Sequence, residues 1–182
     1  MTIIIIVVVV VLLVGYGVST YNKLIRLRNK SEESAAAIDA HLKKRYDLIP
    51  NIVETVKGYA QHEKKTLTAV IEARNAAMGA TTLSEKDEAS QAFSSTLKSL
   101  FALSESYPEL KANQGFLDLQ QQLQRIEEEL LQVRKYYNAV VKEMNTMVET
   151  IPSSFIAKIA SFTKSPYLTV EEQERERVDV KF

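Results

Sequence analysis

The chain has 182 residues with 23 basic and 23 acidic side chains, so its formal net charge is zero. A balanced charge lacks the field that attracts nucleic acid, and we therefore expect no nucleic-acid partner. The lack of cysteine excludes disulfides, thiolate chemistry and cysteine-ligated metals. Few glycines and prolines among many strong helix formers predict an all-α fold.

The first segment, residues 2–20, is uncharged and rich in isoleucine and valine. About 19 residues rising about 1.5 Å each would span roughly 28 Å, enough to cross a bilayer core. Two tyrosines and four basic residues mark its end, and no acid occurs over residues 21–30: Tyr16, Tyr21, Lys23, Arg26, Arg28 and Lys30. Aromatic rings favour the headgroup level and basic flanks favour the cytoplasm, so we predict a transmembrane helix with its N-terminus outside. A cleaved signal peptide is disfavoured because no basic region precedes the apolar run.

No proline or glycine occurs between Val18 and Ile49, so the spanning helix should continue into the next segment. Pro50 is the first break signal, because Asp47 can cap a new helix and proline disfavours helical dihedrals in the residue before it. We therefore favour a turn at Asp47, Pro50 and Asn51, with a second helix from residue 48 to about 78. A kink within one longer helix is the alternative.

Two further helices follow. Residues 79–82 predict a loop, and Ser84 with Asp87 has the spacing of a capping box. Pro108 and Gly115 bracket the connection to the last long helix, which should end at Pro152. Its apolar residues alternate spacings of four and three, which predicts a bundle core or a coiled coil; they are Leu119, Leu123, Ile126, Leu130, Val133, Tyr137, Val140, Met144, Met147 and Ile151.

These elements predict an all-α protein in which the transmembrane helix continues into an antiparallel long-helix bundle, four-helix or kinked three-helix. The expected divisions are residues 2–20 for the span, 21–168 for the bundle and 169–182 for a charged tail. A short apolar segment after the last helix would return toward the membrane, with Phe155, Ile156, Ile159 and Phe162. It could contact the lipid surface or pack on the open end of the bundle, and the pattern leaves both open.

Catalytic and metal-binding patterns are sparse. His41 and His62 lack partners in helical register, and we interpret both as surface residues. Consecutive acids at 127–129 point in different directions on a helix and cannot close on one ion. No phosphate loop or nucleophile elbow occurs. We therefore predict no catalytic residues, no metal site and no cofactor.

Four charged residues accompany apolar rows of the predicted helices: Glu63, Arg74, Glu127 and Arg134. A buried charge must be paired, so such residues form an interior network that sets helix register or a site that binds a partner. Register-setting ion pairs are the favoured interpretation, and a partner site is the alternative.

Residues 45–60, RYDLIPNIVETVKGYA, closely resemble the hallmark segment of the LemA family. Further positions similar to the family follow in the same order along residues 21–168: Tyr21–Asn22, Glu63, Ala73–Arg74, Tyr107–Asn113, Phe116–Gln120, Leu123, Arg134, Tyr136–Asn138 and Pro166–Tyr167. One departure is Glu127–Leu130, where the family commonly has a basic residue and isoleucine after its glutamate. It removes the basis for carrying a family ion pair over to position 129.

The resemblance implies a bacterial inner-membrane protein with its N-terminus outside, its helical bundle in the cytoplasm and no established enzymatic activity. Relatives associated with magnetosome membrane formation suggest a membrane-organising role by analogy. The leading hypothesis is a non-enzymatic scaffold that oligomerises at the membrane, with the lipid bilayer and further copies of itself as partners. The alternative is a membrane-tethered adaptor that recruits a cytoplasmic protein, and an enzyme is disfavoured.

Overall fold

The computed structural model describes residues 1–169, so the predicted charged tail lies outside the described residues from position 170 onward. Unit 1 comprises Met1–Ala35 and Lys135–Leu168, and unit 2 comprises Ala36–Arg134 with Thr169. Over residues 1–169 all regular secondary structure is helical, which confirms the all-α prediction.

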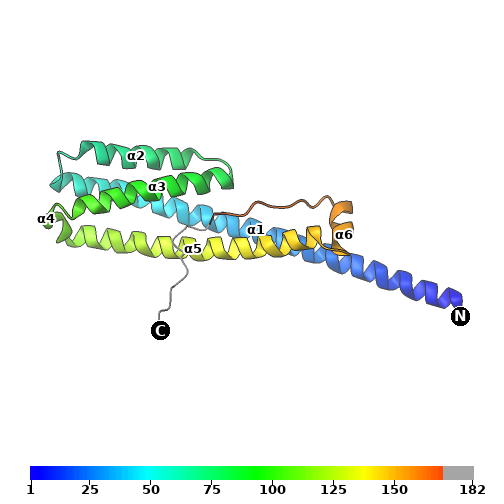
Figure 1. Cartoon of the computed structure of the whole chain (residues 1–182). Coiled ribbons are helices and arrows are strands. Elements are labelled where there is room, and N and C mark those ends of the chain that lie inside the picture. Colours follow the sequence, from blue (N-terminus) through cyan, green and yellow to red (C-terminus); the bar gives the residue numbers. More distant parts are fainter. Residues whose placement is uncertain (170–182) are drawn as a thin grey trace, which may run out of the picture. The chain divides into compact units, whose positions relative to one another are not determined.

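Two long helices dominate the chain (Figure 1). Helix α1 spans Thr2–Tyr59 and α5 spans Gln114–Glu149, and each contributes residues to both units. Unit 2 also contains α2 (Lys64–Gly79), α3 (Leu83–Ser104) and the short α4 (Pro108–Lys111). Unit 1 also contains α6 (Ser153–Ile159). The predicted continuation of the first helix beyond residue 20 is confirmed.

The favoured turn at Asp47, Pro50 and Asn51 is wrong. All three residues are exposed positions within α1, and the break comes after Tyr59. The second helix therefore begins at Lys64 rather than at residue 48.

Burial on the opposite side of α1 explains why the helix continues past Pro50. Ile49, Ile52 and Val56 have 0% exposure, and one continuous helix keeps them on a common face. Proline in a helix interior costs about 3 kcal/mol, whereas burying each of these side chains contributes about 1.5–3 kcal/mol. Tertiary burial therefore outweighs the local signal.

In unit 2 four helical segments pack as an antiparallel bundle, with the end of α1, α2, α3 and the start of α5 alternating in direction (Figure 1). Its core takes buried apolar side chains from all four: Ile38, Leu42, Tyr46, Ile49, Ile52, Val56, Leu67, Val70, Ala77, Phe93, Leu97, Leu100, Phe116, Leu123 and Leu130. The four-helix alternative is thus the observed arrangement, with its first turn ten residues later than predicted, at residues 60–63 instead of 50.

The predicted seam along α5 is partly observed. Five of its positions are buried, namely Leu123, Leu130, Tyr137, Val140 and Met144. Ile151 is 77% exposed and lies beyond the helix, which ends at Glu149. The predicted end near Pro152 is therefore close, but the last seam position is wrong.

Helix α3 begins two residues earlier than the predicted capping box. Thr82 is the N-cap: its hydroxyl accepts from the Glu85 N–H at 3.2 Å, and the Glu85 carboxylate accepts from the Thr82 N–H at 3.0 Å. Ser84 and Asp87 do not form the box, because the Asp87 side chain is buried in the bundle. A spacing of three residues cannot distinguish the two choices.

This cap predicts an acid-sensitive contribution to stability. Backbone hydrogen bonds from Thr82 and Thr81 lower the pKa of Glu85 from 4.5 to about 2. Because the folded pKa lies below the unfolded one, the stabilisation is present above pH 4.5 and is lost as the pH falls toward 2. Glu85→Gln should lower the thermal midpoint of the full chain in detergent at pH 7, and the difference from the parent should shrink between pH 5 and pH 3. Glu88→Gln, an exposed carboxylate on α3, is the control, and a pH-independent difference would contradict the prediction.

Unit 1 combines the start of α1 with the end of α5 and with α6. Buried Leu24 and Leu27 of α1, Val140 and Met144 of α5 and Ala157 of α6 form its apolar cluster. Within residues 1–169, α1 alone is long and apolar enough to span a membrane, and its apolar stretch is unburied. Helix α6 ends in a turn at residues 160–161, and residues 162–168, which have no regular secondary structure, form a segment that we call the C-terminal strap.

Candidate functional site

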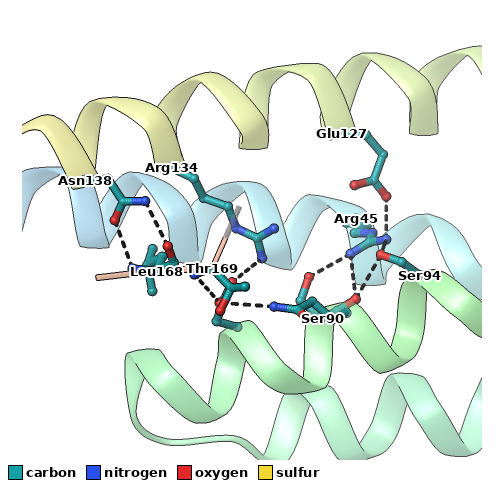
Figure 2. A network of polar contacts seen from close by, with 10 residues as sticks. Arg45, Ser90, Ser94, Glu127, Arg134, Asn138, Leu168 and Thr169 are labelled. Atoms are coloured by element: carbon teal, nitrogen blue, oxygen red, sulfur yellow. Dashed lines mark hydrogen bonds and ion pairs between the residues drawn. The ribbon is translucent and has the colours of Figure 1, made fainter. Parts of the chain in front are cut away.

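A buried arginine lies at the centre of unit 2. Arg45, which is 1% exposed, donates from Nη1 to the Ser90 hydroxyl at 2.8 Å and from Nη2 to the Ser94 hydroxyl at 2.7 Å. Its Nη2 also lies 2.5 Å from the Glu127 carboxylate, and the guanidinium stacks 4.9 Å from the Phe93 ring centroid. Figure 2 shows Arg45 between Glu127 of α5 and the two serines of α3.

The sequence around Arg45 explains this geometry. Ser90 and Ser94 are one helical turn apart, so their hydroxyls face the same side of α3 and match the planar fork of a guanidinium. Arg45 follows Leu42 by three residues and precedes Ile49 by four, which places it in the buried row of α1. That spacing could have identified Arg45 from the sequence, and we missed it.

A second buried ion pair joins Arg134 of α5 to Asp87 of α3. Arg134 Nη2 lies 3.0 Å from Asp87 Oδ1, and the two side chains are only 10% and 6% exposed. The other carboxylate oxygen accepts from the Thr169 N–H at 2.9 Å and from Gln91 at 3.3 Å (Figure 2). Asp87 therefore neutralises a buried cation and also holds the backbone at Thr169.

The four predicted interior charges do not form one network. Glu127 and Arg134 belong to the two separate ion pairs described above. Glu63 accepts from the Tyr107 hydroxyl at 3.2 Å, and desolvation together with this carboxylate raises the pKa of Tyr107. Arg74 has a different role, toward the backbone of α1.

Arg74 compensates for the proline within α1. In an α-helix the carbonyl of residue 46 would accept from the N–H of residue 50, but Pro50 has none. The Arg74 Nε donates to the Tyr46 carbonyl instead, at 2.8 Å. A side chain of α2 thus satisfies the backbone group that the proline leaves free, and this contact explains how α1 accommodates Pro50.

This contact predicts a coupling between the two positions. Arg74→Met should cost about 1–3 kcal/mol of unfolding free energy, because the partly buried Tyr46 carbonyl loses its donor. In a Pro50→Ala background the cost should fall, since alanine at that position supplies the missing N–H. Urea unfolding of the four proteins of this cycle in mild detergent measures the coupling. Lys44→Met, an exposed cation of α1, serves as control, and an equal cost of Arg74→Met in both backgrounds would rule the explanation out.

In unit 1, two asparagines hold the C-terminal strap. Asn145 donates to the Ser165 carbonyl and accepts from its N–H, both at 2.9 Å. Asn138 makes the same pair of 2.9 Å bonds with Leu168 (Figure 2). Each amide side chain therefore binds both the N–H and the carbonyl of one strap residue. Asn138 and Asn145 are seven residues apart on α5 and lie on the same face of that helix.

The strap connects two of the motifs that resembled the family. The Tyr137 hydroxyl donates to the Pro166 carbonyl at 3.2 Å, next to the Asn138 contacts. Tyr137, Asn138 and Pro166 therefore belong to one structural feature of unit 1. Sequence reasoning missed it, because backbone recognition leaves no periodic signal in the strap.

The acids at 127–129 have separate partners. Glu129 lies 3.2 Å from His41 Nδ1, and Glu128 accepts from Gln124 at 3.1 Å. The interpretation of His41 as a surface residue is wrong, since its side chain is only 18% exposed and faces Glu129 of α5, a partner that the register of its own helix does not reveal. Within residues 1–169 no group of three or more His, Cys, Asp or Glu side chains is placed to hold a metal ion.

The basic flank of the apolar segment is partly engaged inside unit 1. Lys23 forms a 2.7 Å ion pair with Glu143, and Arg28 lies 5.4 Å from the Phe162 ring centroid. Tyr21 meets the same ring edge-on at 6.3 Å. The remaining members of the flank, Tyr16, Arg26 and Lys30, are exposed on α1.

These features define an all-helical protein with one N-terminal helix long and apolar enough to cross a membrane and a bundle joined internally by buried arginines. The LemA family model matches residues 34–182, and the chain belongs to this family. The chain is similar to Protein LemA of Metamycoplasma hominis, with 24% identity over 166 residues that cover 89% of this chain and 74% of that protein. The predicted family is confirmed, and it is not known for enzymatic activity. The apolar segment precedes the matched range.

Proposed function

We propose that this protein is a non-enzymatic, single-pass membrane scaffold that forms homo-oligomers at the bacterial inner membrane and organises membrane or envelope components. The observation that carries the proposal is α1. Its first part is an unburied apolar stretch, and its last part supplies Tyr46, Ile49 and Ile52 to the bundle core. One helix therefore serves as both anchor and bundle component, without the flexible linker that would let a tethered domain search for substrates.

The polar interior supports a structural role. Catalysis needs polar groups that converge where a substrate can reach them. Here the buried arginines at 45 and 134 meet carboxylates and hydroxyls of neighbouring helices, and Arg74 meets a backbone carbonyl. These contacts join helices to one another, as register-setting pairs do.

The proposed orientation places the N-terminus outside and the bundle in the cytoplasm, because basic residues follow the apolar stretch. The chain has no cysteine, so single cysteines can report it cleanly. In spheroplasts a membrane-impermeant maleimide should label Thr2→Cys directly and Glu105→Cys only after lysis. The reverse pattern would refute the orientation without affecting the anchor.

Oligomerisation is supported by exposed apolar side chains on unit 2. Ile71 and Met78 of α2 are 42% and 53% exposed, and their spacing of seven places them on one face. Light scattering of the full chain in mild detergent should give a defined multimer, which Ile71→Lys with Met78→Lys should dissociate. Glu72→Lys, an exposed position beside this face, is the matched control. A stable monomer of the unmodified chain would refute the scaffold.

A second candidate, an adaptor for a cytoplasmic protein, is favoured by a cleft of about 310 Å³ in unit 2. Leu97, Phe101 and Leu123 form an apolar wall beside Arg45 and Glu127. A photo-crosslinker at Gln124, which lines this cleft, should then capture one defined protein, whereas the same group at Glu88 should not. Equal capture at both positions would count against the adaptor.

A further inference from the structure

Helix α6 has large apolar side chains that are exposed rather than packed within unit 1. Phe155 and Ile159 are 62% and 82% exposed, and Ile151, just before the helix, is 77% exposed. Phe155 and Ile159 are four residues apart and therefore lie on the same side of α6. Contiguous exposed side chains of this size mark an interaction surface rather than an ordinary solvated one.

The other side of α6 is packed. Ala157 and Ser153 are 1% and 8% exposed, and Ala157 belongs to the buried apolar cluster of unit 1. Ile156 Cδ1 lies 3.6 Å from the point that a Cβ on Gly17 of α1 would occupy. Helix α6 therefore lies directly beside α1 (Figure 1), and the small Gly17 leaves room for Ile156.

The position of Gly17 along α1 indicates what the exposed face of α6 contacts. Gly17 lies near the end of residues 2–20, whose apolar side chains are exposed along the whole stretch. Phe155 and Ile159 thus continue an apolar surface that already exists within unit 1. Exposed Tyr16 and Tyr21 lie at the same level, and such rings mark the boundary between acyl chains and headgroups.

We propose that the exposed face of α6, formed by Phe155 and Ile159, inserts together with Ile151 into the interfacial layer of the leaflet from which α1 emerges. The ligand is the lipid surface itself, and α6 is a second membrane contact beside the span. This inference rests on the proposed function, because it requires residues 2–20 to cross the bilayer. Short apolar helices of this kind lie in the interface plane with one face among the acyl chains.

The sequence left open whether the segment after α5 contacts lipid or packs against the helices. The two interpretations apply to different residues of the segment. Ile156 and Phe162 pack inside unit 1, Ile156 near Gly17 and Phe162 against Tyr21 and Arg28. Phe155 and Ile159 point away and meet lipid.

The test measures depth at single cysteines in the full chain reconstituted in vesicles of phosphatidylcholine and phosphatidylglycerol. An environment-sensitive fluorophore is placed at Ile159→Cys, with Val10→Cys as the marker of the span and Glu88→Cys as the aqueous marker on α3. Lipids carrying nitroxide near the headgroup should quench the label at position 159 several-fold more than the label at 88. Aqueous iodide should show the opposite order, and position 10 should respond to nitroxide deep in the acyl chains.

A matched pair of variants tests the face itself. Phe155→Asp should reduce lipid quenching at position 159 several-fold, whereas Lys158→Gln, exposed on α6 but not part of the apolar face, should leave it unchanged. The proposal is overturned if position 159 behaves like position 88. It is also overturned if position 159 is shielded from both quenchers and crosslinks between chains, because a second copy then covers the face. Loss of deep quenching at position 10 would instead show that the span, and with it the proposed function, is wrong.

Discussion

Replacing Glu127 by glutamine should destabilise the protein by about 3–5 kcal/mol, because it removes the carboxylate that faces a buried guanidinium. Arg45 is only 1% exposed, so the parent structure offers its guanidinium little water in place of the carboxylate. Replacing Arg45 by methionine should cost less, about 1–3 kcal/mol. The remaining Glu127 side chain is 38% exposed and can be solvated, and the Ser94 hydroxyl already donates to the Ser90 carbonyl within its own helix.

The experiment is a double-mutant cycle by chemical unfolding of the full chain in mild detergent. Arg45→Met combined with Glu127→Gln should cost less than the sum of the single variants, because the cation that the carboxylate served is gone. Glu128→Gln, the neighbouring carboxylate that contacts Gln124 on its own helix, should change stability little. A larger loss for Arg45→Met than for Glu127→Gln would show that the arginine acts mainly through its contacts to α3 and to Phe93.

Local sequence signals were sufficient for the all-α fold, for the apolar segment and for most helix ends. Uninterrupted apolar and helix-forming residues predicted the continuation of α1 beyond residue 20, and glycine and proline placed the loops near residues 80 and 112 and the end of α5. These features depend on chain segments of a few turns. Their physical causes are therefore contained in short stretches of sequence.

The error at Pro50 came from a contact that no local pattern contains. Proline and its neighbours favour a break, but the donor that relieves the break, Arg74, bonds to a carbonyl 28 residues away. The sequence marks Arg74 as a charge in an apolar row, a pattern that favours another charge as its partner. The partner is the Tyr46 carbonyl, which lacks a backbone donor because residue 50 is proline. Pro50 and Arg74 therefore have to be considered together to predict either the continuous helix or the contact.

The error at Asp87 came from a spacing that fits two different structures. A capping box and a buried ion pair can both place an acid three residues after a serine, and the pattern alone favours the common cap. The observed cap uses Thr82 and Glu85, and Asp87 faces Arg134 across the bundle. The asparagines that hold the strap were missed for a related reason, because their partners are backbone groups whose position depends on the fold.

Replacing Asp87 by asparagine should be as damaging as the loss of Glu127, about 3–5 kcal/mol, because Arg134 is only 10% exposed and loses the carboxylate that neutralises it. The variant keeps the side-chain shape and an oxygen that can accept from the Thr169 N–H, so it isolates the effect of charge. Thermal and chemical unfolding measure the loss. Asp118→Asn, an exposed carboxylate on α5, is the matched control, and a loss no larger than its own would contradict the prediction.

Adding Arg134→Met to Asp87→Asn distinguishes the contribution of the ion pair to stability from its role in setting helix register. Removing both charges also removes the cost of their desolvation, so the double variant should recover much of the loss caused by Asp87→Asn. If the ion pair sets helix register, the recovered protein should still show altered packing where Asp87 accepts from the Thr169 N–H. Amide hydrogen exchange at Thr169 measures this, since the amide should be protected in the parent and should exchange faster in the double variant. Unchanged protection would mean that the pair contributes electrostatic energy alone.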